Sequence, residues 1–521
     1  MKVLIKYPLA LAVAFAVLTS AALAGSDNVV SGSNSQLLSG SIASSSVSQT
    51  ANNYAWVTGS GNTVNQENAQ NVVGSIVDTS ASLTQVVNNY ATIEGDDNSV
   101  ANSNLQQVSG GSEISGTMGQ TANNYATING DSNLVTNANT QQVPDASLVS
   151  GTMIQTANNY AMINGDSNLV TNTNTQQATS GSPVTGTMIQ TAQNDAFIGL
   201  NGGEGHNNIV TQSNEQTLSN GASADSLVAS QSNFAAIASS NSGDESAGYN
   251  HITQSNSQVL DGPDTYVNSA SANQNNYATI PRSGEKTGSS SSPNQITGTN
   301  SQLINGGSEV TTAAATQTNT VYLESDAKGA KHNAPGNIIS GSNAQTITGS
   351  VAETATATQS NNALFQGKKA VYSENDVSGS NSQTISNSLV SLAAAVQNNN
   401  AYANSEGALV NGNIVIGSNA QTIADSSTGS ASATQSNMAA LGTSDISEAD
   451  IQHNTILGTN SQSLIGGSFA DSATATQANN AILQGAYNHD NAVTGENSQS
   501  LDDGSYVKTV TQTVSNFAQL S

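Results

Sequence analysis

The chain has 521 residues, with 35 acidic and 9 basic side chains and a formal net charge of −26. This acidic balance disfavours nucleic acid as a partner, and because the chain lacks cysteine, disulfides cannot contribute to its stability. Charged residues make up 8 % and aromatic residues 4 % of the chain, so small and amide side chains dominate. Such a composition usually indicates disorder, but a regular repeat along this chain favours an ordered fold.

The N-terminal residues have the three parts of a secretory signal. Lys2 and Lys6 are followed by an apolar run at 9–18 and by the sequence ALA at 22–24. The apolar run is too short for a typical membrane-spanning helix. We therefore predict that 1–24 is a Sec signal peptide and that the protein is secreted to the extracellular space or the cell surface.

A repeat of 34 to 44 residues fills the remainder of the chain. Each of thirteen copies contains an Asn-x-Gln segment, such as Asn34 and Gln36, and then a second segment with Gln and Asn, such as Gln49 and Asn53. A period of this size indicates stacked supersecondary units rather than one globular core.

The spacing within the repeat divides the chain into two parts. From the first Asn to the second Gln there are 15 to 18 residues, whereas 19 to 26 residues lead to the next repeat. Insertions are therefore expected at one edge of the stack. We predict compact, regular repeats in 25–200 and repeats with longer loop insertions in 201–521.

Residues alternate in character along both segments, as expected for strands. Asn139 and Gln141 share one face of the first segment, and Gln155 and Asn159 share one face of the second. Ser and Thr occupy the opposite faces, which we assign to the outside. The predicted fold class is all-β: a flattened β-solenoid of about 13 strand-arc-strand repeats of 34–44 residues.

Burying Asn and Gln is costly unless every amide is bonded, since an unsatisfied amide costs about 1–3 kcal/mol. In a stack, identical amides lie about 4.8 Å apart and can bond to one another as a ladder. The predicted structural ladder comprises Asn34, Gln36, Gln49, Asn53, Asn139, Gln141, Gln155, Asn159, Asn343, Gln345, Gln359, Asn361, Gln477 and Asn479.

The second segment reads QTANNYA at 49–55, ATQSNNA at 357–363 and ATQANNA at 475–481. These segments resemble the curlin repeat of bacterial curli, and the repeat length with its NTQQ elements is similar to the Fap-type functional amyloid repeat. The resemblance implies an extracellular fibre subunit of a biofilm matrix. The matching positions are Gln49, Asn53, Gln120, Asn124, Gln359, Asn361, Gln477 and Asn479.

We expect a structural protein that assembles into extracellular amyloid-like fibres for biofilm matrix and surface adhesion, with strands added at uncapped ends of the stack. It is not expected to be an enzyme or to bind a cofactor, because no catalytic motif appears. The expected partner is the protein itself. Other fibre subunits, outer-membrane secretion machinery and matrix polysaccharide remain open, as does the choice between major subunit and nucleator.

Two other functions remain as alternatives. One is a monomeric β-solenoid adhesin or cell-surface protein. The other is an ice-binding protein, because Thr354, Thr356 and Thr358 resemble the Thr rows of ice-binding solenoids. Such proteins need a regular Thr array in every repeat, and most repeats of this chain lack it.

Tyr54, Tyr90, Tyr125 and Tyr160 occupy the same position of the second segment in the first four repeats. The strand period places them outside, in an aromatic row. Such rows usually provide cross-strand stacking. The alternative is a surface contact with a sugar or a second fibre.

Ionisable residues gather in the arcs between repeats. Asp96, Asp97, Asp131 and Asp166 occupy matching arcs, where turn formation is favoured over a Ca²⁺ site. Histidines and most basic residues lie in the longer arcs, where we expect solvated side chains rather than a metal site or a patch for acidic polysaccharide. They are His206, His251, His332, His453, His489, Arg282, Lys286, Lys328, Lys331, Lys368 and Lys369.

Overall fold

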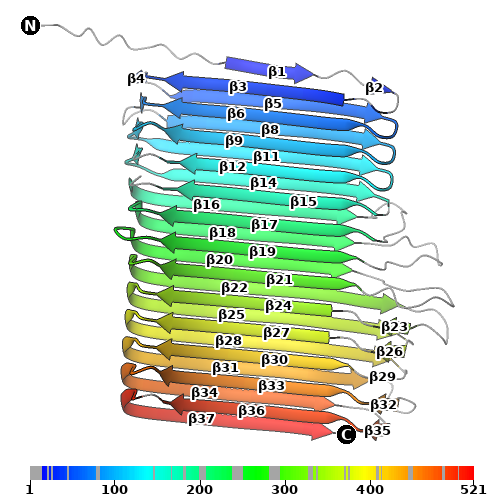
Figure 1. Cartoon of the computed structure of the whole chain (residues 1–521), viewed down its shortest axis with the longest axis vertical. Coiled ribbons are helices and arrows are strands. Elements are labelled where there is room, and N and C mark those ends of the chain that lie inside the picture. Colours follow the sequence, from blue (N-terminus) through cyan, green and yellow to red (C-terminus); the bar gives the residue numbers. More distant parts are fainter. Residues whose placement is uncertain are drawn as a thin grey trace, which may run out of the picture.

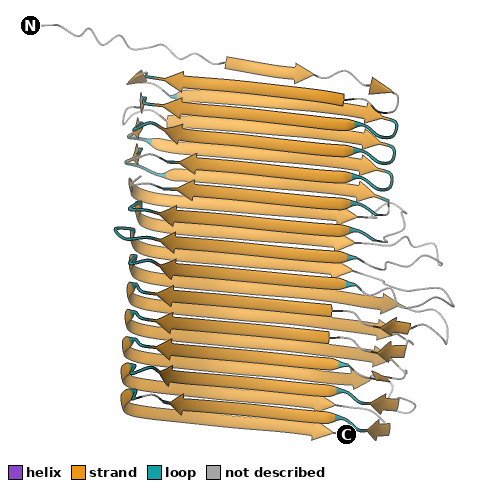
Figure 2. Ribbon diagram, viewed as in Figure 1, coloured by secondary structure: helices purple, strands orange, loops and turns teal. Residues whose placement is uncertain are grey.

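A computed structural model of the chain shows two long sheets that face each other, with no helix in the described part (Figure 1). The structure describes residues 14–19, 23–24, 27, 29–40, 42–43, 46–77, 82–144, 147–165, 167–179, 183–198, 207–237, 250–280, 294–326, 333–335, 338–368, 371–373, 376–406, 410–411, 413–443, 450–483, 487–502 and 504–520. Strands make up most of this part, as Figure 2 shows.

The first strand of every repeat belongs to a parallel sheet of thirteen strands. We call it the first-strand sheet. In order along the stack, its members are β3 (Val29–Ser39), β6 (Thr63–Val73), β9 (Ser99–Ser109), β12 (Leu134–Val143), β15 (Leu169–Ala178), β17 (Ile209–Ser219), β19 (His251–Asp261), β21 (Gln295–Asn305), β24 (Ile338–Thr348), β27 (Asp376–Ser386), β30 (Ile414–Ala424), β33 (Thr455–Ile465) and β36 (Ala492–Leu501).

The second strands pair in the same parallel manner and form the second-strand sheet. They are β5 (Val47–Thr58), β8 (Ser82–Glu94), β11 (Thr117–Asn129), β14 (Met153–Asn164), β16 (Pro183–Ile198), β18 (Ser223–Ile237), β20 (Tyr266–Ile280), β22 (Glu309–Asp326), β25 (Val351–Lys368), β28 (Leu389–Glu406), β31 (Ser427–Thr443), β34 (Phe469–Leu483) and β37 (Tyr506–Leu520).

Short strands lie in the arcs. Four of them join the second-strand sheet: β4 (Ile42–Ala43), β7 (Ile76–Val77), β10 (Glu113–Ile114) and β13 (Leu148–Val149). On the other edge, arcs of the later repeats form a third sheet of β23 (Asn333–Pro335), β26 (Val371–Ser373), β29 (Val410–Asn411), β32 (Asp450–Gln452) and β35 (Tyr487–His489).

Pairing between neighbouring repeats is in register. Asn68 pairs with Asn34 of the preceding repeat and with Asn104 of the following one. Each repeat is therefore one turn of the solenoid, which we call a rung and number from rung 1 (β3 and β5) to rung 13 (β36 and β37). The predicted all-β solenoid of about thirteen repeats is confirmed.

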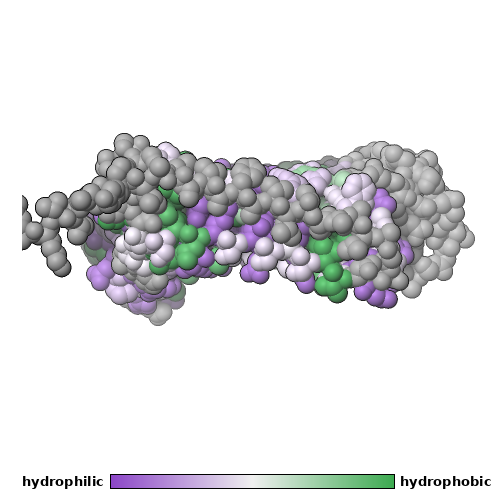
Figure 3. Space-filling view, turned by 90° about the horizontal axis from the view of Figure 1, so that it is seen from above, coloured by the Kyte–Doolittle hydropathy of each residue, from purple (hydrophilic) through white to green (hydrophobic). Residues whose placement is uncertain are grey.

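Seen along the stack, the molecule is a thin slab (Figure 3). Its interior contains two apolar columns, one near each arc edge, which include Ile93 and Ile128 on one side and Leu83 and Met118 on the other. The buried Asn and Gln side chains of the repeat motifs lie between the two columns. Apolar packing thus shields the polar core at both edges.

Two strands from the predicted signal peptide, β1 (Ala14–Thr19) and β2 (Leu23–Ala24), pair with the outer edge of β5. The assignment of 1–24 as a signal peptide stays a prediction. In the full-length chain these residues line the second-strand edge of rung 1. In the first-strand sheet, β3 pairs only with β6 among the described strands.

Within the described residues, no helix is both long and apolar enough to cross a membrane.

Candidate functional site: the buried amide ladders

The motif Asn side chains of both sheets meet at the centre of the slab and form a double ladder. Asn34 Nδ2 donates across the core to Asn53 Oδ1 at 2.7 Å and along the sheet to Asn68 Oδ1 at 3.0 Å. In turn, Asn53 Nδ2 donates to Asn68 Oδ1 at 3.1 Å and to Asn89 Oδ1 at 3.0 Å. The sequence predicted bonds along the stack, and the structure adds bonds across it, so each rung is tied to the next through both sheets.

The Gln side chains form separate ladders whose direction is opposite. Gln70 Nε2 donates to Gln36 Oε1 at 2.8 Å, and Gln85 Nε2 donates to Gln49 Oε1 at 2.7 Å. The N–H groups of the motif Asn residues therefore point toward rung 13, whereas those of the Gln residues in these ladders point toward rung 1. The stack has a chemical polarity that alternation of residues alone does not reveal.

All fourteen predicted ladder residues are at most 7 % exposed and lie in one of these ladders. Beyond those already described, the bonds are Asn139 to Asn174, Gln141 to Gln106, Gln155 to Gln120, Asn159 to Asn194, Asn343 to Asn381, Gln345 to Gln302, Gln359 to Gln317, Asn361 to Asn399, Gln477 to Gln435 and Asn479 to Asn516, at 2.8–3.4 Å.

The Gln ladders are interrupted near the middle of the molecule. In the second strand, Gln lies four residues before the motif Asn in rungs 1–5 and two residues before it in rungs 6–12, so Gln190 aligns with Ala229 rather than with Gln231. In the first strand, Gln216 Oε1 and Gln258 Nε2 are buried without a partner. The Asn double ladder continues through this seam, where Asn194 Nδ2 donates to Asn233 Oδ1 at 2.9 Å.

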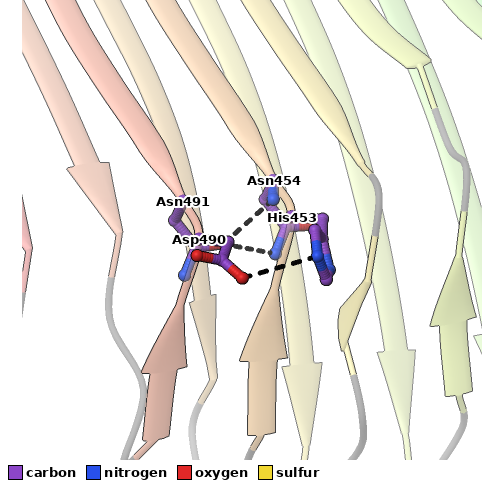
Figure 4. Close-up of polar contacts among 4 residues, drawn as sticks. All are labelled: His453, Asn454, Asp490 and Asn491. Atoms are coloured by element: carbon purple, nitrogen blue, oxygen red, sulfur yellow. Dashed lines mark hydrogen bonds and ion pairs between the residues drawn. The ribbon is translucent and has the colours of Figure 1, made fainter.

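A further Asn ladder lies in the arc before the first strand, and sequence reasoning missed it. Asn454 N–H donates to Asn491 Oδ1 at 2.9 Å (Figure 4), as Asn62 N–H donates to Asn98 Oδ1 at 2.8 Å. The signal was available, because an Asn lies six residues before the motif Asn in all thirteen repeats.

In several arcs the residue before the arc Asn has a positive φ angle and makes the turn, as Asp97 and Ser132 do. In Figure 4, His453 and Asp490 precede the paired Asn residues, and both have positive φ angles of 53°. Their side chains form a His453 Nε2–Asp490 Oδ2 contact of 3.6 Å, with both side chains more than half exposed. His251 is the first residue of β19 and directly follows the arc residue Asn250. Its Nε2 atom lies 2.9 Å from Thr253 Oγ1.

The four predicted Tyr residues lie on the outer face of the second-strand sheet. Tyr54 and Tyr90 stack with ring centroids 4.9 Å apart, and Tyr90 and Tyr125 with centroids 4.8 Å apart. Tyr125 and Tyr160 are tilted, at 6.3 Å. Because the faces of the first three rings are turned toward one another along the stack, they present mainly edges outward, which is unfavourable for stacking of a sugar on them.

The aromatic row continues beyond the predicted residues. Phe197, Phe234 and Tyr277 follow Tyr160 with centroid separations of 5.1–5.6 Å. Within this row, Asp195 takes the register position of a Tyr. Burial raises the pKa of Asp195, and a hydrogen bond from Gln193 opposes that rise.

One of the arc carboxylates, that of Asp96, has a backbone partner. Asp96 Oδ1 accepts the N–H of Asp131 at 2.8 Å, and Asp97 has a positive φ of 56°, as turn formation requires. Asp166 lies outside the described residues. The described part of the chain holds no group of three or more His, Cys, Asp and Glu side chains suited to a metal.

Most of the basic cluster, Arg282, Lys286, Lys328, Lys331 and Lys369, lies outside the described residues, together with His206 and His332. The Thr row is short. Thr356 pairs with Ala314 on one side and Ala394 on the other, so no continuous Thr array forms at this position.

No protein-family model, curated protein or solved structure matches this chain. The class that the fold defines is a parallel β-solenoid with a hydrogen-bonded amide core.

Proposed function

We propose that this protein is a secreted structural subunit that assembles into extracellular amyloid-like fibres, as the resemblance to curlin and Fap repeats implies. The observation that carries the proposal is the state of rung 13. Its core amides Gln512 and Asn516 are exposed, whereas the corresponding amides of the earlier rungs are buried.

An exposed rung of this kind favours addition of another strand. An edge strand presents unpaired backbone N–H and C=O groups, which is a template for pairing with a second chain. Large apolar side chains of β37 are also exposed, with Val510 at 47 %, Val514 at 45 % and Phe517 at 48 %. A matching rung would cover both the amides and the apolar side chains.

The proposed partner is a second copy of the chain, and the proposed setting is a biofilm matrix or a cell surface to which fibres give adhesion. Other fibre subunits, outer-membrane secretion machinery and matrix polysaccharide are further proposed partners. The acidic net charge of −26 keeps separate subunits apart before the ends meet.

A monomeric solenoid adhesin is the second candidate, and one observation favours it. In the full-length chain, β1 and β2 lie against the edge of β5, so one end of the second-strand sheet is already paired. This arrangement would block addition at that end for as long as 1–24 remains attached.

The test is to dilute chain 25–521 from denaturant and to follow thioflavin fluorescence and electron micrographs. Fibres that appear after a lag, and sooner when preformed fragments are added, are expected. A soluble rod with a β-type circular dichroism spectrum, unchanged by fragments, would contradict the proposal and favour the adhesin. The full-length chain is the matched control, and it is expected to assemble more slowly.

A further inference from the structure

The two end rungs share a combination of core residues that occurs in no other rung. Two features vary along the stack: the residue two positions before the first-strand Asn, and the distance from Gln to Asn in the second strand. In rungs 2–5 the first-strand residue is an amide and the second-strand Gln lies four residues before Asn. In rungs 6–7 the first-strand residue is again an amide, but Gln lies two residues before Asn. In rungs 8–12 the first-strand residue is a glycine and Gln lies two residues before Asn. Rung 1 (Gly32, Gln49) and rung 13 (Gly495, Gln512) combine a glycine with a Gln four residues before Asn.

This combination makes rung 13 a poor match for its own neighbour. Gln512 lies opposite Ala475, and Val514 lies opposite Gln477. Gln512 Nε2 therefore reaches Gln477 Oε1 diagonally, at 3.3 Å, whereas the preceding bond from Gln477 Nε2 to Gln435 Oε1 is 2.9 Å. The Gln ladder of rungs 6–12 is thus not continued in register by rung 13.

Rung 13 is instead a good match for rung 1. When the motif Asn residues are aligned, Gly495 meets Gly32, Gln499 meets Gln36 and Gln512 meets Gln49. Phe517 then meets Tyr54, in the register in which Tyr54 stacks on Tyr90. In rungs 8–12 this outer position holds no aromatic residue.

The polarity of the ladders is complementary at the two ends. Through the stack, each second-strand Asn donates to Asn residues of the next rung, as Asn437 donates to Asn460 and Asn479 at 2.8 and 3.0 Å. Asn516 Nδ2 makes no such bond within the described chain. At the other end, Asn34 and Asn53 of rung 1 occupy the positions that Asn460 and Asn479 take relative to Asn437, so their Oδ1 atoms would accept from Asn516. Asn53 Oδ1 already accepts one bond, from Asn34 Nδ2.

We propose that rung 13 of one copy stacks in register on rung 1 of the next copy, so that the Asn double ladder and a Gln ladder run across the junction. This inference rests on the proposed fibre function and names its interface. It requires that β1 and β2 leave the edge of β5, as removal of the predicted signal peptide would ensure. Contact between two copies of rung 13 would oppose like groups, Asn N–H to Asn N–H, so the fibre is polar.

The test moves the second-strand Gln of rung 13 from position 512 to position 514. The double substitution Gln512→Ala/Val514→Gln gives β37 the sequence ATQSN, which also occurs at 357–361 and 433–437. It improves the match with β34, because the new Gln lies opposite Gln477, but it leaves Gln49 of the next copy without its partner. The fold is therefore retained while the junction is damaged.

The variant and the wild type are expressed as the full chain, recovered after export, and added as monomers to sonicated wild-type fibre fragments. We expect elongation by the variant to be about tenfold slower or more, since an unpaired buried amide remains at each junction. The matched control is Thr511→Ser/Thr513→Ser, which changes outward positions of the same strand and should elongate at the wild-type rate. Hydrogen exchange in β31 and β34 verifies that rungs 11 and 12 are intact.

Two results would overturn the junction. If the Gln512→Ala/Val514→Gln variant elongates as fast as the wild type while the fibres remain seedable, the junction is wrong and the fibre function stands. If the wild type forms no seedable fibres, the fibre function fails and the junction fails with it.

Discussion

The N-terminal region of the solenoid (rungs 2–5) and its C-terminal region (rungs 8–12) have the same Asn double ladder but differ in the amides around it. In the N-terminal region the first strand carries an additional amide, which donates across the core to a backbone carbonyl, as Asn137 Nδ2 does to Tyr160 O at 3.4 Å. In the C-terminal region a glycine replaces that amide, and the second-strand Gln reaches across instead, as Gln359 Nε2 does to Ser382 O at 2.9 Å.

Each region therefore satisfies its buried polar groups in its own way. A Cβ added at Gly341 would lie 2.9 Å from Asn361 Oδ1 and 3.2 Å from Asn319 Cβ. In the N-terminal region, the same position accommodates the whole side chain of Asn137. The Asn double ladder is thus the common frame, whereas the extra amide and the position of the second-strand Gln vary along the stack, and rungs 6–7 combine the amide with the Gln position of the C-terminal region.

The largest expected effect comes from the shared frame. Asn159→Asp and Asn361→Asp each replace an N–H donor with a carboxylate that faces several oxygens. Asn159 Nδ2 lies 2.9 Å from Asn174 Oδ1, and Asn361 Nδ2 lies 2.8 Å from Asn381 Oδ1. An uncompensated buried charge costs about 3–5 kcal/mol. We expect loss of hydrogen-exchange protection in the substituted rung and both neighbours, to the same extent in the two regions.

The controls are Asn158→Asp and Asn362→Asp, which place the same charge one residue away on the outer face. They should reduce protection much less, because a charge on the outer face is screened by solvent, although Asn158→Asp also removes the bond from Asn158 Nδ2 to Asn123 Oδ1. A clear difference between Asn159→Asp and Asn361→Asp would mean that the double ladder is not equivalent in the two regions.

The second prediction tests the difference between the regions. Gly341→Ala forces Cβ against a fixed Asn361 amide and should cost about 1–3 kcal/mol, as overpacking does. Asn137→Ala removes three hydrogen bonds, to Tyr160 O at 3.4 Å, to Asn172 Oδ1 at 3.1 Å and from Asn102 Nδ2 at 3.0 Å. It leaves buried ladder partners unsatisfied and should cost at least as much, about 1–3 kcal/mol. Denaturant midpoints of the two variants and of the wild type measure both losses, and a Gly341→Ala midpoint equal to that of the wild type would show that the glycine is not sterically required.

Sequence reasoning succeeded where the property depends on local alternation. The two-residue period placed Gln155 and Asn159 on the inner face, and the repeat length predicted a stack of supersecondary units. Both follow from strand geometry, which each strand determines for itself.

It failed where the property depends on two strands at once. The cross-core bond from Asn34 to Asn53 depends on how far apart the sheets lie, and alternation within one strand carries no such information. The shift of Gln from four to two residues before Asn was visible, but its consequence, the placement of Gln190 opposite Ala229 rather than opposite Gln231, appears only when neighbouring rungs are aligned. The arc Asn ladder was missed because a constant Asn in a turn is also explained by turn formation alone.

The smallest effect is expected in rung 5, where Asp195 interrupts the aromatic row. Burial raises the pKa of this carboxyl above its ordinary value of 3.8. Between the ordinary and the raised pKa, the folded protein binds more protons than the unfolded chain, so stability increases as pH falls through this window and the burial penalty is complete at neutral pH. The pKa of Tyr160 is raised mainly by burial of its own side chain and to a lesser extent by the negative charge of Asp195.

Asp195→Asn should therefore stabilise the fold at pH 7, by less than about 1 kcal/mol because the carboxyl is partly solvated, and the gain should vanish at a pH below both pKa values. Denaturant midpoints at pH 7 and pH 3 measure this difference, with the exposed Asp225→Asn as the matched control. A gain of equal size at both pH values would assign the effect to packing in the aromatic row. A gain confined to pH 7 would mean that the single charge in this row opposes the stacking of the neighbouring rings. The N-terminal region would then differ from rungs 8–12, in which no charged residue occupies this outer position.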